Sequence, residues 1–211
     1  MTVSTERASP LSDYSARVSA ASAASSMFSI REVPFTAQIN IRGNAADAAF
    51  TGKARSVLEC DLPSAANTWS GGPECAALWL GPDEWLVVAP DGSNETLCST
   101  LRNGLAGAHH AVTDVSASRT IIEIAGKDAR AVLAKGCPLD LHASSFRPPQ
   151  TAQTLLAKSQ VVLQCVDAQP TFRLFVRISF AHYIADWLID AATELGASRN
   201  IDSDRIASRL A

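Results

Sequence analysis

The stretch Ile39-Asn-Ile-Arg-Gly43 has a counterpart later in the chain, Ile122-Glu-Ile-Ala-Gly126. Both alternate apolar and polar residues and then reach a glycine, which is typical of a strand with one buried face. An alanine-rich segment with an early aspartate, Asp47 or Asp128, follows each of them. An aspartate in the first turn favours a helix because it faces the positive end of the helix dipole. The pattern predicts a strand followed by a helix, used twice.

The first half of the chain is expected to continue with a hairpin and a second helix. Residues 78–80 and 85–89 are apolar and flank Gly81-Pro-Asp83, a sequence that favours a tight turn. Ser93 is a good residue to begin a helix, because a serine side chain can accept a hydrogen bond from the first free backbone amides. Leu97, Leu101 and Leu105 then form one apolar stripe.

The second half is expected to repeat this order, with strands at 161–166 and 171–178. Alternate residues of the latter strand share a face. One face carries Phe172, Leu174, Val176 and Ile178, and the other carries Arg173, Phe175 and Arg177. Ser179 is expected to begin a helix that Gly196 ends, with an apolar stripe of Phe180, Ile184, Trp187, Ala191 and Leu195.

This order of elements predicts an α+β fold with mainly antiparallel sheet, rather than a doubly wound parallel sheet. We expect two similar subdomains of ferredoxin-like type, at residues 28–112 and 113–196. They should pack together, because a unit of roughly 80 residues is only marginally stable alone.

The two ends of the chain carry weaker signals. Ten of the twelve residues from 15 to 26 are Ser or Ala, too little side chain to offset the entropy lost on ordering. Residues 1–27 are therefore predicted to be mostly disordered. Residues 197–211 form a tail, either a short amphipathic helix or a frayed end.

Composition and motifs exclude several classes of function. The formal charge of −3 with dispersed basic residues gives no electrostatic footprint for nucleic acid. No apolar run approaches the roughly 20 residues that span a membrane. The five cysteines form no C-x-x-C pair, which argues against zinc and favours reduced thiols in a cytoplasmic location. Dinucleotide loops, phosphate loops and a G-x-S-x-G elbow are absent from the sequence. We expect no catalytic, cofactor-binding or metal-binding residue in this chain.

Seven residues are candidates for an interface or a structural role: Trp85, Asp114, Arg119, Cys137, His142, Phe175 and Arg177. Asp114 and Arg119 are close enough in sequence to form a buried or interfacial charge pair. Phe175 and Arg177 combine the residue types that often anchor interfaces, although an ordinary solvated sheet face explains them equally well. Trp85 fits either an interface or an apolar core.

Cys137 and His142 lie in a compact string, Gly136-Cys-Pro-Leu-Asp-Leu-His142. Gly136 and Pro138 are typical of the end of a helix and the exit from it. A reactive thiol or imidazole is the alternative, but no third group is visible in the sequence to orient these two residues. We therefore favour a structural role.

The chain resembles the gamma subunit of heterotetrameric sarcosine oxidase from about Ser9 to Gly196. The matching strings are Ser9-Pro-Leu11, Arg31-Glu-Val-Pro-Phe35, Trp79-Leu-Gly-Pro-Asp-Glu-Trp-Leu86, Asp114-Val-Ser116, Ala134-Lys-Gly-Cys-Pro-Leu-Asp-Leu-His142, Ala152-Gln-Thr-Leu-Leu-Ala-Lys158 and residues 177–187. The resemblance implies a non-catalytic subunit that supports assembly. The family enzyme converts sarcosine to glycine, forms hydrogen peroxide and can pass the one-carbon unit to tetrahydrofolate. The resemblance further implies that FAD, FMN, NAD, zinc and tetrahydrofolate are held by partners, the alpha, beta and delta subunits.

The C-terminal half also resembles the folate-binding domain of aminomethyltransferase, the T-protein, through Asp114-Val-Ser116, the strand to Gly126, Asp128-Ala129 and Leu133. That family continues from a Thr-Leu-Leu-like strand into Gly-Gly-x-x-Asp-Asp. Here Thr154-Leu-Leu156 leads to Gln164 and Cys165 in place of the acids. An uncharged glutamine cannot act as a carboxylate base. The fold is expected to carry over without the folate chemistry, and a free-standing folate-binding one-carbon transferase is the alternative.

Overall fold

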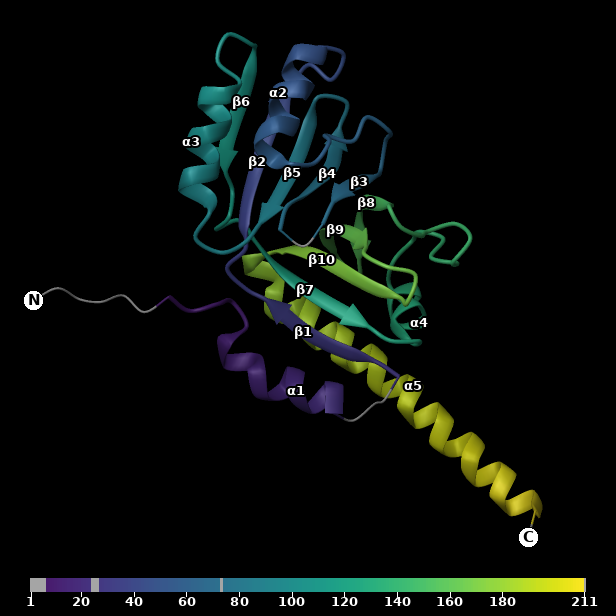
Figure 1. The fold of residues 1–211 in the computed structure, drawn as a ribbon. Helices are drawn as coiled ribbons and strands as arrows, with labels where there is room; N and C mark the ends of the chain where they lie inside the picture. Colours follow the sequence, from purple (N-terminus) through teal and green to yellow (C-terminus); the bar gives the residue numbers. More distant parts are fainter. Residues whose placement is uncertain (1–6, 24–26, 73, 211) are drawn as a thin grey trace, which may run out of the picture.

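The computed structural model describes residues 7–23, 27–72 and 74–210, with side chains as far as residue 195. In these residues, two five-stranded sheets stack face to face, and helices cover the outer face of each sheet (Figure 1). The layers are therefore helices, sheet, sheet and helices. Each of the three boundaries between layers is filled by its own cluster of buried apolar side chains.

The first sheet has the strand order β3-β4-β5-β2-β6, and all of its pairings are antiparallel. Its strands are β2 (Ala37–Gly43), β3 (Trp69–Gly71), β4 (Ala76–Gly81), β5 (Glu84–Ala89) and β6 (His110–Asp114). Helices α2 (Ala48–Leu58) and α3 (Asn94–Gly104) cover its outer face. The hairpin predicted around Gly81-Pro-Asp83 is confirmed as β4 and β5.

The second sheet has the strand order β1-β7-β10-β9-β8 and is also antiparallel throughout. Its strands are β1 (Ser29–Val33), β7 (Arg119–Ala125), β8 (Thr151–Leu156), β9 (Ser159–Cys165) and β10 (Thr171–Arg177). Helices α1 (Ser15–Ala23), α4 (Ala129–Ala134) and α5 (Ala181–Leu210) cover its outer face, and the short 3-10 turns η1 (Ser12–Tyr14) and η2 (Ile178–Phe180) precede α1 and α5. The predicted α+β fold with two similar antiparallel halves is confirmed.

The first of the two repeated helices begins for the local reason that the sequence indicates. Asp47 caps α2, with its Oδ1 accepting a hydrogen bond of 2.8 Å from the amide of Ala49. The two glycines that end the repeated strands are required for different reasons. A Cβ on Gly43 would lie 2.3 Å from the buried ring of Phe50. Gly126 has a φ of +110°, which side chains disfavour, and its Cβ would lie 2.4 Å from the Met27 carbonyl oxygen.

The predicted boundary between the halves, at residue 112, differs from the structure in two places. Strand β1 lies within the predicted first subdomain, yet it pairs with β7 of the second sheet, from Ser29 opposite Ala125 to Val33 opposite Ile121. Strand β6 runs past residue 112 to Asp114. The pairing with β1 covers the edge of β7, whose backbone amides and carbonyls would otherwise lack partners in the sheet.

The structure also differs from the prediction that residues 1–27 are mostly disordered. The turn η1 and the helix α1 lie over the second sheet, where Leu11 and Val18 are only 2% and 7% exposed. Ser22 accepts from the amide of Ile30 and donates to its carbonyl oxygen, at 2.9 and 2.8 Å. Few apolar residues suffice because they join an existing core instead of forming their own. Residues 1–6 and 24–26 of this prediction lie outside the described residues.

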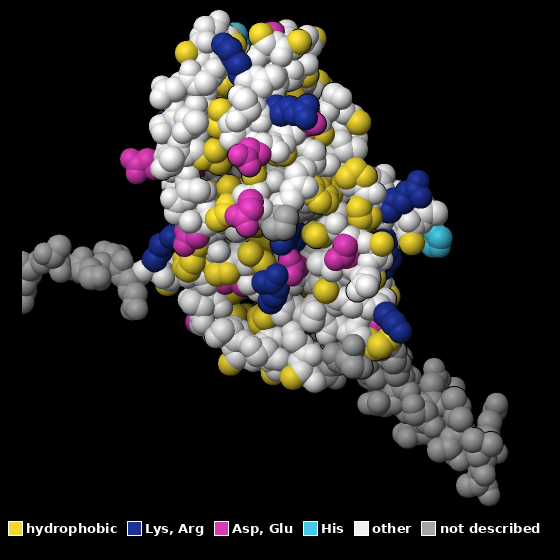
Figure 2. All heavy atoms as spheres, viewed as in Figure 1, with side chains coloured by type: hydrophobic (Ala, Val, Ile, Leu, Met, Phe, Trp, Pro, Cys, Tyr) yellow, Lys and Arg dark blue, Asp and Glu magenta, His cyan; other side chains and the backbone are white. Residues whose placement is uncertain are grey.

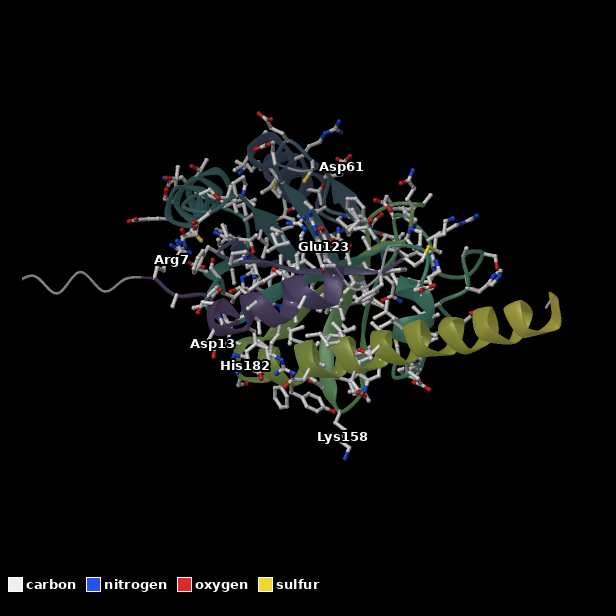
Figure 3. All side chains as sticks on the ribbon, turned by 90° about the horizontal axis from the view of Figure 1, so that it is seen from below. Arg7, Asp13, Asp61, Glu123, Lys158 and His182 are labelled. Atoms are coloured by element: carbon white, nitrogen blue, oxygen red, sulfur yellow. The ribbon has the colours of Figure 1, made fainter. Side chains whose placement is uncertain are left out.

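Helix α1 lies alongside α5 at the outer face of the second sheet (Figure 3). Near the beginning of α5, His182 contacts the turn η1. Its Nε2 lies 3.1 Å from a carboxylate oxygen of Asp13, and its ring stacks on Tyr14 with 4.3 Å between centroids. Helix α5 begins two residues after Ser179, because η2 occupies 178–180. Of the predicted stripe, Ile184 and Ala191 are buried, Trp187 and Leu195 pack partly buried against the core, and Phe180 is exposed. The other buried side chains of α5 are Ala181, Ala185 and Leu188. The helix also continues through Gly196, where the sequence predicted its end.

Candidate functional site

The face of the second sheet that turns toward the first sheet carries three rows of side chains. Paired residues on neighbouring antiparallel strands share a face, and every second residue returns to it. The ion row consists of Arg31, Glu123 and Arg173. The apolar row consists of Val33, Ile121, Phe175 and Val162. The arginine row consists of Arg119, Arg177, Gln160 and Leu155.

The apolar row fills the space between the two sheets. Ile121, Phe175 and Val162 are buried against Leu78 and Leu86 of the first sheet. This contact explains why the two halves form one unit, since neither sheet could expose such a face to water without loss of stability. Phe175 therefore lies in the seam between the halves.

The charged groups of the ion row are hydrogen-bonded to one another within the sheet. Glu123 accepts a hydrogen bond of 2.8 Å from Nε of Arg31 and one of 2.9 Å from Nε of Arg173. Its side chain is 11% exposed. Two arginines on either side of one carboxylate satisfy both of its oxygens, so this row stabilises the sheet without needing an external group.

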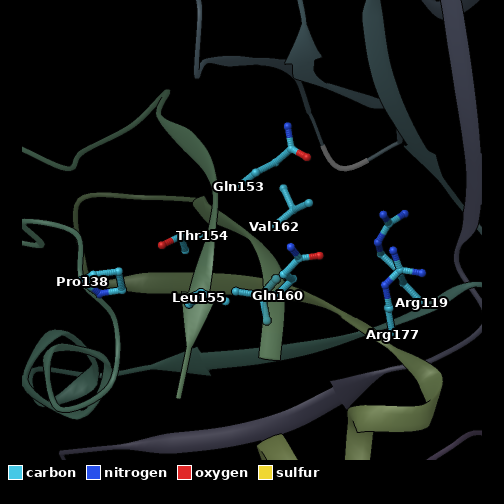
Figure 4. Close-up of a pocket in the computed structure, with 9 residues that line it drawn as sticks. Arg119, Pro138, Gln153, Thr154, Leu155, Gln160, Val162 and Arg177 are labelled. Atoms are coloured by element: carbon cyan, nitrogen blue, oxygen red, sulfur yellow. The ribbon is translucent and has the colours of Figure 1, made fainter. Parts of the chain in front are cut away.

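The arginine row does not compensate its charges in the same way. Arg119 lies opposite Arg177, and the two guanidinium groups extend side by side (Figure 4). Within the described residues, neither side chain forms an ion pair or a hydrogen bond. Burial and the adjacent Arg177 both lower the pKa of the Arg119 guanidinium, and Glu84 opposes this effect from a distance. The carboxylate of Glu84 is engaged by Asn40, whose Nδ2 donates to it at 2.8 Å.

A hollow of about 480 Å³ opens in front of the arginine row. Arg119 and Arg177 line one side of it, and Gln153, Gln160 and Leu155 line another (Figure 4). The side chain of Gln153 also donates a 2.7 Å hydrogen bond to the Leu80 carbonyl of the first sheet, which fixes the wall of the hollow. The hollow is therefore lined by residues of the second sheet, together with Pro138, and one hydrogen bond ties its wall to the first sheet.

Exposed apolar side chains accompany the arginine row. Among the described residues, the exposed large hydrophobic side chains are Leu155 (45%), Ile178 (49%), Phe180 (41%) and Tyr183 (40%). Leu155 belongs to the row itself, and Ile178 follows Arg177 directly and lines a second hollow that also reaches Arg119. This is the combination of arginine and large apolar side chains that typifies protein interfaces. On the face in Figure 2, by contrast, acidic and basic side chains are interspersed.

Two of the other candidate residues have roles that differ from the sequence predictions. Trp85 is fully buried between the first sheet and α2, and its Nε1 donates 2.8 Å to the Pro63 carbonyl. It is a core residue and presents no surface to a partner. Asp114 does not pair with Arg119. It accepts hydrogen bonds from Ser116 and, at 2.7 Å, from Asn94, and the Ser116 hydroxyl is the main cause of its lowered pKa.

Cys137 and His142 lie in different environments. Cys137 is buried, with its Sγ 3.8 Å from the Thr154 hydroxyl. His142 is exposed, with its Nδ1 2.7 Å from the Ser144 hydroxyl. The structure thus places them in separate environments, as expected for a loop that ends a helix. Among residues 7–23, 27–72 and 74–195, no group of three or more His, Cys, Asp or Glu could hold a metal ion. Nor does the described part of the chain contain a helix with the length and apolar character of a membrane span.

Comparison with known proteins identifies the family. The model of the sarcosine oxidase gamma subunit family matches residues 42–194. This chain belongs to the sarcosine oxidase gamma subunit family. A curated relative from Corynebacterium sp. (strain U-96), named sarcosine oxidase subunit gamma, is 36% identical over 200 residues. That match covers 91% of this chain and 93% of the relative, so the family resemblance expected from the sequence is confirmed.

Solved structures support membership of the gamma subunit family at the level of the fold. The heterotetrameric sarcosine oxidase from Corynebacterium sp. U-96, in complex with pyrrole 2-carboxylate, contains a chain that matches with a TM-score of 0.83 and 33% identity. The match covers 90% of this chain and 96% of that chain. Aminomethyltransferase T of the glycine cleavage system from Bartonella henselae matches with a TM-score of 0.59 and 14% identity, over 82% of this chain and 48% of that chain. The latter likeness shows a shared fold alone.

In this gamma-subunit chain, Gln164 and Cys165, which the sequence predicts in place of the acids of the aminomethyltransferase family, are interior residues. Both are buried in β9. Burial raises the pKa of the Cys165 thiol, which keeps it protonated at neutral pH. Neither residue supplies a carboxylate, so the residues of this strand do not fit acid–base chemistry on a folate.

Proposed function

We propose that this chain is the gamma subunit of a sarcosine oxidase complex and that it contributes to assembly rather than to chemistry. The observation that carries the proposal is the agreement, over 90% of this chain, with a chain of a heterotetrameric sarcosine oxidase. The buried, separately engaged Cys137 and the exposed His142 support a structural role. An uncompensated arginine row beside exposed apolar side chains supports contact with another protein.

The complex would convert sarcosine to glycine with formation of hydrogen peroxide and pass the one-carbon unit to tetrahydrofolate. FAD, FMN, NAD, zinc and tetrahydrofolate would be bound by the partners, the alpha, beta and delta subunits, and the complex would act in the cytoplasm. In this proposal, every oxidation step lies outside this chain. Its own contribution is the surface that it offers to the flavin-bearing subunits.

The alternative, a free-standing folate-binding one-carbon transferase, is not favoured. The likeness to aminomethyltransferase T has 14% identity and extends to the fold. The buried Gln164 and Cys165 offer no charged oxygen to a folate amine.

An omission experiment tests the proposed function. The alpha, beta and delta subunits are produced together with and without this chain, and the products are compared by size-exclusion chromatography, flavin absorbance and sarcosine-dependent peroxide formation. We expect the full set to yield one flavin-containing complex and the incomplete set to yield unassembled or unstable subunits. The purified chain alone should show neither flavin absorbance nor oxidase activity. A stable and fully active enzyme formed without this chain would contradict the proposal.

A further inference from the structure

The arginine row has two charges that form no ion pair with any acid of the described residues. Glu84 acts on Arg119 only through its charge, and its carboxylate is hydrogen-bonded by Asn40. Arg119 is half-buried and Arg177 is exposed, and they are direct cross-strand neighbours. Like charges directly opposite one another on adjacent strands destabilise a sheet. A negative group placed against both guanidinium groups would therefore stabilise a sheet that contains such a pair.

We propose that the arginine row receives a carboxylate side chain of a neighbouring subunit, and that Leu155 and Ile178 pack against apolar residues around that carboxylate. This inference rests on the proposed function, since it supposes that the chain acts within a complex. It names the part of the surface that makes the contact and the chemistry of the group that it contacts.

The ion row shows that the same sheet accommodates such an arrangement. There, one carboxylate, that of Glu123, accepts from Arg31 and from Arg173 at 2.8 and 2.9 Å. In the arginine row, the place of the carboxylate is open to the outside through the hollow of about 480 Å³. A guanidinium group presents two parallel N–H donors to a carboxylate, so a single acidic side chain can engage both arginines.

A polypeptide fits this site better than a free small anion does. A small anion would use the two arginines but would leave Leu155 and Ile178 in water. A polypeptide covers both, and interface hot spots combine arginine with large apolar side chains in this manner. Strand β8, which carries Leu155, is also an edge strand of the second sheet, and natural sheets commonly cover or protect such edges.

Assembly of the complex with arginine variants tests the inference. The full tagged chain carrying Arg119→Gln, Arg177→Gln or both is combined with the alpha, beta and delta subunits, and dissociation on dilution is followed by mass photometry. The matched control is Arg42→Gln, which removes an exposed arginine of the first sheet that pairs with Asp83 at 3.0 Å. We expect the double variant to weaken assembly by roughly 30-fold or more, as for truncation of a desolvated charge pair, and the control to leave assembly unchanged.

Salt dependence and a conservative variant make the test independent of misfolding. Assembly of the wild-type chain should weaken with added NaCl more steeply than assembly of the double variant, because salt screens the pair. Arg177→Lys should retain part of the affinity, and thermal unfolding of each isolated variant should match that of the wild type.

Three results would overturn the inference. If the double variant assembles as tightly as the wild type, the arginine row is not the contact, while the proposed function stands. If the isolated wild-type chain binds succinate and the double variant does not, with assembly unchanged, the site serves a small anion instead. If the wild-type chain does not associate with the other subunits at all, the proposed function itself fails.

Discussion

The ion row and the arginine row lie on the same two strands, four residues apart. The charged groups of the ion row are paired with one another, whereas the two arginines of the arginine row are not paired within the described residues. In both rows, β7 and β10 place charged residues on the inner face. The difference is the residue that β7 contributes, which is Glu123 opposite Arg173 in the ion row and Arg119 opposite Arg177 in the arginine row. Strand β1 adds Arg31 beside Glu123, and its pairing with β7 ends at Val33 opposite Ile121. The comparison teaches that the cross-strand partner decides whether a charge on a sheet is paired within the chain or available to a partner.

The largest expected effect concerns the apolar row that separates these two charged rows. Phe175→Ala should lower the free energy of unfolding by about 3–5 kcal/mol, because it leaves a cavity between the two sheets. Urea unfolding of the isolated chain measures this loss. Phe180→Ala is the matched control, since Phe180 is 41% exposed and should change stability far less. Equal losses at the two positions would contradict the described seam.

Loss of the central acid should convert the ion row into a second uncompensated arginine pair. Glu123→Gln should cost about 1–3 kcal/mol of unfolding free energy, because two charge-assisted hydrogen bonds are weakened at a nearly buried site. Asp83→Asn, which weakens the exposed pair with Arg42, is the control and should cost under about 1 kcal/mol. If chemical unfolding finds no difference between these variants, the ion row is not structural.

In the isolated chain, removing a charge from the arginine row should not lower stability as removing Glu123 does. Arg119→Gln removes one of two like charges and no internal hydrogen bond, so stability should stay within about 0.5 kcal/mol of the wild type, or rise slightly. Thermal unfolding at low and high NaCl checks this, because the small gain should vanish when salt screens the repulsion. A loss well above this range would reveal an internal partner for Arg119.

The smallest effect concerns Asp114, the acid that the sequence had suggested as a partner for Arg119. Hydrogen bonds from Ser116 and Asn94 hold its pKa below the ordinary value of 3.8, so the charged form stabilises the fold above that pH. This contribution is lost as the pH falls through the lowered pKa. Asp114→Asn should therefore show a small loss at neutral pH that fades below about pH 4, when unfolding is measured across pH. A loss that persists in acid would contradict this assignment.

The parts of the fold that local sequence determines were predictable. The alternation around Ile39 and Ile122, the cap at Asp47 and the turn at Gly81-Pro-Asp83 are short-range signals, and each marks the element that forms there. The position of β1, the docking of α1 and the buried side of α5 depend on contacts with distant residues. Periodicity within a segment carries no information about which surface the segment will meet.

The candidate site was predictable to the same extent. Alternation within β10 correctly places Arg173, Phe175 and Arg177 on one face. It cannot tell that Arg173 meets Glu123 while Arg177 meets Arg119, because the partner on the next strand follows from the pairing register. Burial of Trp85 likewise depends on α2, which packs over it from elsewhere in the chain.

The native mass of the material that co-purifies with this chain tests the central claim most directly. The tagged chain is recovered gently from its own cells and examined by native mass spectrometry together with its visible absorbance. We predict a stoichiometric complex with larger subunits and the absorbance of bound flavin. A lone species at the mass of the chain itself, 22.3 kDa, without flavin would contradict the account.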